Sequence, residues 1–337
     1  MRILPGLNTI ARQAESLKGR LEDAIDALRP PDLPAYKEER GPYQVKTTKQ
    51  GFVDETRDRK IPLKVYSPEG GDPNEEHPVV VFSHGLAGNS LTYDYIGKHL
   101  ASHGYLVLQP THVGSDTYSV LRHGPLSTFQ QRELVDRGKD VSFCLDRLEE
   151  GKIETDAKPD LEHVGLAGHS FGALTAQAMA GLPVQAHDGH HFNLGDERID
   201  AFVAMSPYGD SAPSRLLGLD VNGYDHIDQP ILYMSGSRDT LFTMGRGAKT
   251  HLTPYYRTPG PDKYHVLVGG ARHEEFAQVL GQLDRNLATM VNSSTTAFFD
   301  AYLREDPAAS RYLHDDLGEV ALAHRSTAMV GGCNQDA

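Results

Sequence analysis

A serine lies between two glycines at residues 168–172, which read Gly-His-Ser-Phe-Gly. Residues 163–167 before it form a short apolar run and residues 173–180 after it are rich in alanine, so the pattern predicts a strand, a sharp turn and a helix. The glycines leave room where a Cβ would clash, and the serine must adopt strained backbone angles. This arrangement is typical of a nucleophile elbow, and it nominates Ser170 as a covalent nucleophile.

A serine hydroxyl needs a base, and the base needs a carboxylate that orients it. Where such elbows occur, the partners follow along the chain as serine, then acid, then histidine. The apolar residues 231–234 end in a loop that carries Asp239, and the next apolar run leads into His273. The sequence therefore predicts Asp239 as the acid and His273 as the base. Asp210, in the loop after the preceding strand, is the competing acid.

Acyl transfer on such a serine also requires backbone N–H groups that stabilise an oxyanion. We expect one donor at Phe171, the residue after the nucleophile, and the second at Leu86, in the loop after the first fully apolar strand at residues 79–82. His84 in the same loop is expected to brace the loop through hydrogen bonds rather than to react.

Alternating strands and helices are expected to position these residues. Two amphipathic strands are predicted near residues 44–50 and 61–66. Further strands are predicted at residues 79–82, 105–108, 164–167, 201–205, 231–234 and 264–268, and helices near residues 90–102, 129–150, 172–180, 241–250 and 285–303. Mostly continuous apolar strands indicate an α/β fold with a mostly parallel central sheet flanked by helices. Inserts at residues 110–128 and 206–228 follow carboxyl ends of strands and are expected to shape a ligand cleft.

The chain of 337 residues is predicted to hold one large domain, at residues 43–305. Residues 1–42 are predicted to be an N-terminal helix and linker, and residues 306–337 a C-terminal tail. Apolar residues recur every three or four positions over residues 3–28, which predicts an amphipathic helix. Because its apolar seam is short, we expect the helix to dock on its own domain; a homodimer zipper and a membrane-surface helix are the alternatives.

Charge and composition exclude several classes of partner. The formal net charge of −13 argues against nucleic acid and anionic membranes. No run of about 20 apolar residues is present, so no membrane insertion is expected.

The cysteines, Cys144 and Cys333, fall in a predicted helix and in the polar tail, which favours a reducing, cytoplasmic location. The start of the chain lacks an apolar signal core, and a removed leader is the alternative.

A histidine-rich loop at residues 187–191, His-Asp-Gly-His-His, contains side chains that can bind metals. It has neither a second pair of ligands nor the helical spacing of a zinc motif. We therefore expect a solvated loop, and we predict neither a metal nor a cofactor.

With these motifs the chain resembles the α/β-hydrolase superfamily, and within it the platelet-activating-factor acetylhydrolase and predicted dienelactone hydrolase group of bacterial esterases. The resemblance runs from about Val79 to Leu303. It depends on residues 82–86, 95–108, 168–172 and 294–303. The resemblance implies the α/β-hydrolase fold and an esterase activity without a cofactor.

Two positions depart from the named relatives. Animal platelet-activating-factor acetylhydrolases carry their acid after the strand that follows the nucleophile helix, where this chain reads Ala-Met-Ser-Pro at residues 204–207. The bacterial pattern instead matches Asp239. True dienelactone hydrolases use a cysteine nucleophile where this chain has Ser170, so dienelactone hydrolysis is not implied.

Motifs and resemblance together predict a serine carboxylic-ester hydrolase that acts through an acyl-enzyme on short-acyl or small esters. A polyester or cutinase-like hydrolase is the second reading. A hydrolase-fold protein that binds a ligand without cleaving it is the alternative from another functional class. The complete set of serine, acid and histidine argues against that alternative, since a binding protein does not need all three.

Overall fold

The computed structural model describes residues 36–89, 91–186, 188–240, 249–278, 284–316 and 328–330. The predicted N-terminal helix at residues 3–28 lies outside these residues. Of the helix predicted at residues 241–250, only the end is described, and there α8 runs over Lys249–Arg257.

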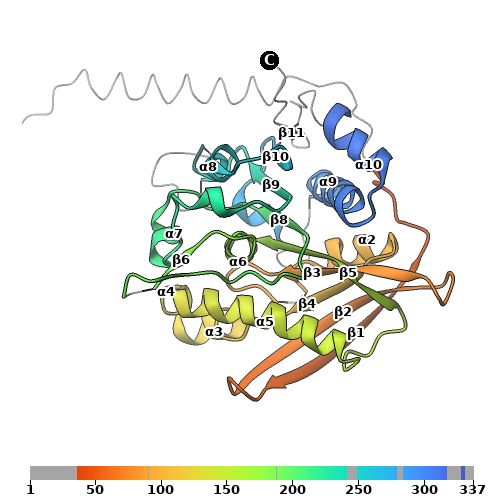
Figure 1. Cartoon of the computed structure of the whole chain (residues 1–337), viewed down its shortest axis with the longest axis horizontal. Coiled ribbons are helices and arrows are strands. Elements are labelled where there is room, and N and C mark those ends of the chain that lie inside the picture. The colour runs from red at the N-terminus through yellow and green to blue at the C-terminus, as the bar shows by residue number, and fades with distance from the viewer. Residues whose placement is uncertain are drawn as a thin grey trace, which may run out of the picture.

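Nine of the described strands form one sheet in the order β1-β2-β4-β3-β5-β8-β9-β10-β11 (Figure 1). These strands are β1 (Gln44–Asp54), β2 (Arg59–Glu69), β3 (Glu76–Ser83), β4 (Leu106–Pro110), β5 (Lys158–His169), β8 (Ala201–Met205), β9 (Ile231–Gly236), β10 (Lys263–Val268) and β11 (Ala328–Val330). The neighbours from β4 to β10 are parallel, whereas β1, β2 and β11 are attached in antiparallel fashion. The predicted mostly parallel sheet is confirmed.

Helices cover both faces of this sheet (Figure 1). The longer helices are α2 (Asp94–Ser102), α5 (Gln131–Glu149), α6 (Phe171–Met179) and α9 (Arg285–Leu303). Shorter elements are α3 (Thr117–His123), α4 (Pro125–Thr128), β6 (Val184–Gln185), β7 (His191–Phe192), α7 (Ala212–Leu216), η1 (Tyr224–His226), η2 (His273–Phe276), α10 (Pro307–Arg311) and η3 (Tyr312–Asp316). Both predicted inserts therefore contain short helices.

The two sheet faces carry separate apolar cores, and β3 contributes to both because successive side chains of a strand point to opposite faces. Val79 and Val81 belong to the core that includes residues of α5 and α6. Val80 and Phe82 belong to the core that includes residues of α2 and α9. A strand buried on both faces reads as a continuous apolar run, which explains the sequence pattern.

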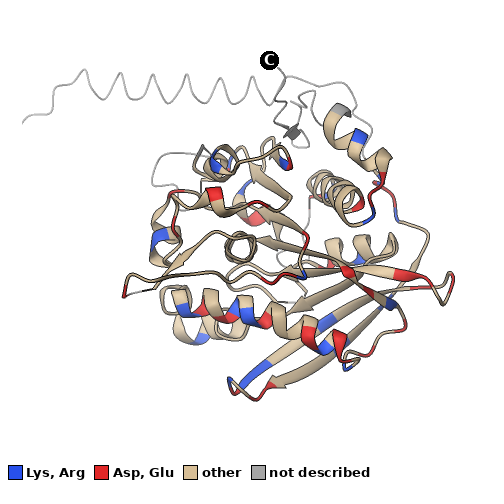
Figure 2. Cartoon of the chain, in the orientation of Figure 1, with Lys and Arg blue, Asp and Glu red and all other residues tan. Residues whose placement is uncertain are grey.

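Charged residues are frequent on helix α5 and on the β1–β2 hairpin (Figure 2). Asp140 of α5 forms one ion pair with Arg57 at 2.9 Å and another with Arg59 at 2.8 Å. These contacts attach the hairpin to the helix. No helix in the described residues combines the length and the apolar character that a membrane span needs.

Part of the predicted C-terminal tail packs against the domain. Ala309 of α10 and Leu313 of η3 are fully buried, and Leu313 joins the core shared with α9. β11 pairs with β10 at the sheet edge. The described residues from 306 onward therefore extend the domain beyond the boundary expected at residue 305. The physical reason is that Ala309 and Leu313, two apolar side chains in a polar segment, are buried.

Candidate active site

Ser170 lies at the sharp turn between β5 and α6. Its backbone angles are φ 56° and ψ −113°, a left-handed conformation that costs energy for a residue with a Cβ. The flanking glycines make the turn possible: a Cβ on Gly168 would lie 2.3 Å from the Gly172 oxygen, and one on Gly172 would lie 1.9 Å from the Ser83 oxygen. The turn therefore holds the serine side chain at the carboxyl end of β5.

The structure brings Ser170, His273 and Asp239 into contact, although they lie up to 103 residues apart in the chain. Ser170 Oγ is 2.8 Å from Nε2 of His273, and Nδ1 of His273 is 3.0 Å from Oδ2 of Asp239. A carboxylate only accepts, so the ring donates its Nδ1–H to Asp239 and can accept the serine proton at Nε2. The three residues come from the carboxyl ends of β5, β9 and β10.

Asp239 has a second imidazole neighbour that the sequence did not indicate. His251 of α8 places Nε2 3.0 Å from Oδ1 of Asp239, and its Nδ1 is 2.7 Å from the Pro207 oxygen. Burial by itself raises the pKa of Asp239, but the interactions with His251 and His273 outweigh burial and hold that pKa well below its usual range. The acid therefore stays ionised next to His273. No local sequence pattern marks His251, since it reaches the site from a helix.

The competing acid lies elsewhere. Asp210 pairs with Arg215 at 2.5 Å, and about a quarter of its side chain, 28%, is exposed. Among the described residues, the contacts of His273 include Asp239 but not Asp210.

The backbone amides of Leu86 and Phe171 are available next to Ser170. Phe171 is the first residue of α6, where the N–H groups have no partner within the helix and the helix dipole favours negative charge. The loop that carries Leu86 approaches the elbow closely, because a Cβ on Gly85 would lie 3.3 Å from the Ser170 Cβ. Neither amide donates a hydrogen bond within the described residues. The arrangement can therefore stabilise an oxyanion formed on Ser170.

His84 braces the loop that precedes Leu86. Its Nδ1 is 2.7 Å from the Gly85 oxygen, and its Nε2 accepts the N–H of His112 at 2.9 Å. Burial lowers its pKa well below the ordinary value, so the ring is neutral. A neutral ring with both nitrogens engaged holds the loop in shape.

Tyr208 is a further neighbour of His273 that sequence reasoning missed. Its hydroxyl lies 3.1 Å from Nε2 of His273, and its side chain is 1% exposed. Burial raises the pKa of Tyr208 above its ordinary value, so the phenol is neutral. The only sequence signal was its place in the insert at residues 206–228.

His169 contacts the loop that carries His273. Its Nε2 is 3.1 Å from the His273 carbonyl oxygen, and its Nδ1 is 2.8 Å from the Tyr93 hydroxyl. Because a carbonyl only accepts, the ring donates its Nε2–H to His273 and accepts from Tyr93. The residue before the nucleophile thus connects the elbow to the loop after β10.

A second set of serine, histidine and acid shows why hydrogen bonds alone do not define a site. Ser83 Oγ is 3.0 Å from Nε2 of His112, whose Nδ1 is 3.0 Å from Oδ2 of Asp140. All three residues are 0% exposed. Without access for a substrate, this set has a structural role, whereas Ser170 at the elbow is 9% exposed.

The described part of the histidine-rich loop forms no metal cluster. His190 pairs with Asp188 at 3.1 Å and His191 with Asp220 at 3.5 Å, and both histidines are exposed. His187 lies outside the described residues. No group of three or more His, Cys, Asp or Glu side chains in the described parts of the chain could hold a metal ion.

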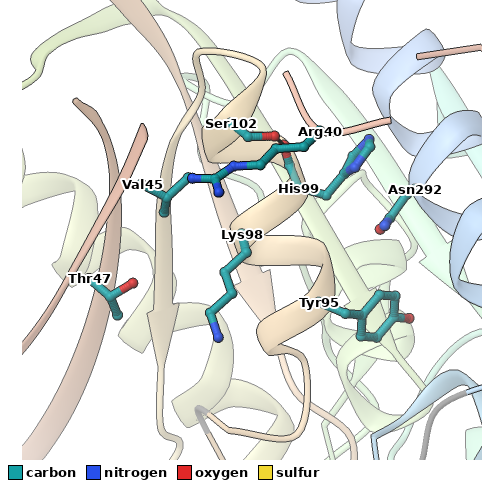
Figure 3. A pocket seen from close by; sticks show the side chains of 8 residues that line it. All are labelled: Arg40, Val45, Thr47, Tyr95, Lys98, His99, Ser102 and Asn292. Carbon is teal, nitrogen blue, oxygen red and sulfur yellow. Dashed lines mark hydrogen bonds between the residues drawn. The ribbon is translucent and has the colours of Figure 1, made fainter. Parts of the chain in front are cut away.

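A hollow of about 440 Å³ lies over α2, between β1 and α9 (Figure 3). Its lining residues are Arg40, Val45, Thr47, Tyr95, Lys98, His99, Ser102 and Asn292. These residues include none of Ser170, Asp239 and His273, so this hollow is separate from the elbow.

Comparisons with known proteins relate the chain to several esterases. A model of the chlorophyllase family matches residues 36–197. The platelet-activating factor acetylhydrolase of Cavia porcellus is 25% identical over an alignment 297 residues long, which covers 73% of this chain and 62% of that protein. Chlorophyllase-1 of Arabidopsis thaliana is 30% identical over 104 residues, which are 31% of this chain and 29% of that protein. The chain thus spans about three fifths of the length of its acetylhydrolase relative.

Among solved structures, the ferulic acid esterase from Streptomyces cinnamoneus superimposes on the chain with a TM-score of 0.60 at 18% sequence identity. The match covers 82% of this chain and 94% of that chain. At this identity the likeness shows a shared fold.

Proposed function

Since this chain belongs to the esterase group of the α/β-hydrolases, we propose that it is a serine carboxylic-ester hydrolase. The predicted fold and the predicted family group are both confirmed by the comparisons. The observation that carries the proposal is the continuous contact from Ser170 Oγ through His273 to Asp239 on a strained elbow. The names of the relatives, which include an acetylhydrolase and a ferulic acid esterase, support the same reaction class.

The proposed reaction has two steps. Ser170 Oγ attacks the ester carbonyl carbon while its proton moves to Nε2 of His273, and the N–H groups of Leu86 and Phe171 stabilise the oxyanion. The bond to the alcohol then breaks, the alcohol takes the proton from His273, and an acyl-enzyme remains. Water attacks this ester with His273 as base, which releases the carboxylic acid and restores Ser170. Asp239 orients His273 throughout.

The proposed substrates are short-acyl or small esters, and the named acetylhydrolase relatives favour an acetyl group. A polyester or cutinase-like activity is the second candidate, because related folds cleave both. The partner we propose is a small, uncharged ester rather than nucleic acid or a membrane, in keeping with the net charge of −13. The buried free thiol of Cys144 agrees with the reducing, cytoplasmic location that we propose.

A fluorophosphonate probe tests the proposal directly, since it reacts with activated serines. We expect the probe to label the full chain once, on the peptide that contains Ser170, and to abolish hydrolysis of p-nitrophenyl acetate in proportion to labelling. If the folded protein is neither labelled by the probe nor able to hydrolyse esters, the alternative is favoured, namely a protein that binds a ligand without cleaving it.

A further inference from the structure

Arg137 of α5 is a fully buried cation behind the loop that carries Leu86. Asp140 and Glu133 act on its charge from a distance and raise its pKa, but no ion pair within 4.0 Å joins its guanidinium to a carboxylate of the described residues. Its contacts are instead with neutral acceptors: Ser115 Oγ at 2.9 Å, Ser83 Oγ at 3.3 Å and the His84 oxygen at 2.6 Å. A buried charge without an ion-pair partner in direct contact costs free energy of folding. We therefore expect Arg137 to act on the groups that it contacts.

These contacts hold two consecutive peptide groups, His84–Gly85 and Gly85–Leu86, the second of which contains the Leu86 N–H. The His84–Gly85 peptide donates its N–H to the Tyr93 hydroxyl at 3.1 Å and accepts from Arg137 at its oxygen. The oxygen of the next peptide, on Gly85, accepts the N–H of Gly88 at 3.0 Å and has Nη2 of Arg137 at 3.5 Å.

The orientation of the second peptide decides where the Leu86 N–H points. In a trans peptide the N–H and C=O bonds point in opposite directions. Because the Gly85 oxygen is held on the side of Arg137, the Leu86 N–H points to the opposite side. Gly85 itself lies against the elbow, with the position of a Cβ on it 3.3 Å from the Ser170 Cβ.

The same guanidinium also contacts the second donor residue. Its central carbon lies 4.2 Å from the centre of the Phe171 ring, within the range of a cation–π contact. Phe171 is 0% exposed and supplies the other free N–H at the start of α6. One buried cation therefore touches both chain segments whose amides face the nucleophile.

The charge remains on Arg137 near neutral pH. Burial lowers the pKa of Arg137 to about 9, which still keeps the guanidinium protonated at pH 7. In surroundings from which water is excluded, a fixed positive charge favours negative charge nearby more strongly than it would in water. The carbonyl groups that it polarises belong to the loop of the Leu86 donor.

We propose that Arg137 is a positioning residue for the oxyanion hole: it fixes the direction of the Leu86 N–H, packs on Phe171 and places a positive charge behind both donors. This inference rests on the proposed ester hydrolysis at Ser170. It predicts that loss of Arg137 weakens stabilisation of the oxyanion more than it weakens binding of the substrate.

The test compares Arg137→Met and Arg137→Lys with the full, unmodified chain. We expect Arg137→Met to lower kcat for p-nitrophenyl acetate by roughly 10 to 100-fold, with KM changed less than about threefold. This loss in kcat is smaller than that for removing one hydrogen-bond donor of an oxyanion hole. The inhibition constant of a trifluoromethyl ketone, which forms an oxyanion on the serine, is expected to rise by the same factor as kcat falls. Arg137→Lys keeps the charge and is expected to recover part of both losses.

Arg304→Met is the matched control. Arg304 also stacks on an aromatic ring, 4.3 Å from that of Tyr105, and donates to a backbone oxygen, that of Gly104, at 2.9 Å. It lies at the end of α9, away from the elbow. We expect Arg304→Met to change thermal stability while kcat and the inhibition constant stay at the level of the parent.

Three outcomes would overturn the inference. A folded Arg137→Met with the kcat of the parent excludes a role of Arg137, and a fall in kcat without a matching rise in the ketone inhibition constant excludes a role through the oxyanion. If Arg137→Met does not fold, the same comparison is made with Arg137→Lys, which keeps a cation in place. A parent that neither reacts with fluorophosphonate nor hydrolyses esters overturns the proposed function and this inference together. If the parent is active, the proposed function stands, and a negative result for the Arg137 variants overturns only the role of Arg137.

Discussion

The hydroxyl of Tyr208 lies 3.1 Å from Nε2 of His273, the same ring atom that faces Ser170 Oγ at 2.8 Å. The rings of Tyr208 and His273 stack, with centres 5.5 Å apart and planes inclined by 23°. The nitrogen that would exchange the proton thus has two hydroxyl neighbours. A neutral phenol can accept from a protonated Nε2 or donate to the serine oxygen, so it can stabilise the charged ring before the alcohol leaves.

We expect Tyr208→Phe to lower kcat roughly 10-fold, the size of the effect of losing one hydrogen bond to a charged group, with a smaller change in KM. Steady-state kinetics on p-nitrophenyl acetate measure both constants. Tyr118→Phe serves as the control, because Tyr118 lies on α3 and is 65% exposed. An unchanged kcat in folded Tyr208→Phe would show that the Tyr208 hydroxyl does not contribute to the reaction and that the side chain only packs against His273.

Ser170→Ala is expected to lower kcat by roughly 10⁴ to 10⁶-fold, as for nucleophile loss in other triads. Ser170→Gly should lose as much activity but be more stable than Ser170→Ala by about 1 kcal/mol, since glycine adopts φ 56° without the penalty of a Cβ. Kinetics and urea unfolding of the two variants check both statements. Substantial turnover by folded Ser170→Ala would rule out Ser170 as nucleophile.

Asp239→Asn should lower kcat by roughly 10⁴-fold, because an amide favours the wrong tautomer of His273. Asp210→Asn should have a mild effect, since Asp210 pairs with Arg215. The two variants are to be compared in the same ester assay after their folding has been verified by circular dichroism. The reverse ranking would assign the role of the acid to Asp210.

Acid is expected to destabilise the fold through buried neutral histidines. Burial lowers the pKa of His265 to about 3 and that of His112 to about 4, from 6.5 in the unfolded chain. The unfolded chain therefore binds protons that the folded chain does not, so the free energy of unfolding is fully retained above pH 6.5. It falls below that pH by about 1.4 kcal/mol per pH unit for each histidine, down to about pH 4.

His265→Gln tests this linkage, because it removes one of these buried histidines and can keep a hydrogen bond to Ser235. Urea unfolding at pH 7, 6, 5 and 4 should give a slope against pH that is smaller by about one proton than in the parent. His190→Gln, on the exposed loop, is the control and should leave the slope unchanged. Equal slopes in parent and His265→Gln would show that His265 does not contribute.

We expect the acyl chain preference to depend on the insert at residues 111–128, which forms α3 and α4. Its large apolar side chains at Leu121 and Leu126 are exposed by 82% and 84%, and polar residues surround them in sequence. Each buried methylene contributes about 0.8 kcal/mol, so long chains need a continuous apolar surface, which we do not expect from an insert of this polar composition. We expect kcat/KM on p-nitrophenyl esters to peak at acetyl to butyryl. A maximum at about eight carbons or more, or activation at a lipid interface, would show that this insert binds acyl chains.

Several features of the chain could be predicted from the sequence because their causes are local. The two glycines around Ser170 are required by a turn in which a Cβ would lie 2.3 Å or less from a backbone oxygen. Continuous apolar runs predicted the parallel strands because burial on both faces removes the alternation of polar residues. The chain order of serine, acid and histidine that accompanies such elbows predicted Asp239 and His273 as partners of Ser170, and the structure brings these residues into contact.

Only the tertiary structure decided which other side chains meet there. Tyr208, His251 and Arg137 come from an insert, a helix after β9 and a helix before β5, and no spacing in the sequence relates them. Their contacts with His273, Asp239 and the loop of Leu86 arise from how helices pack across the sheet. Solvent access is equally non-local: Ser83, His112 and Asp140 repeat the hydrogen-bond pattern of Ser170, His273 and Asp239. All three are 0% exposed, so no substrate can reach them.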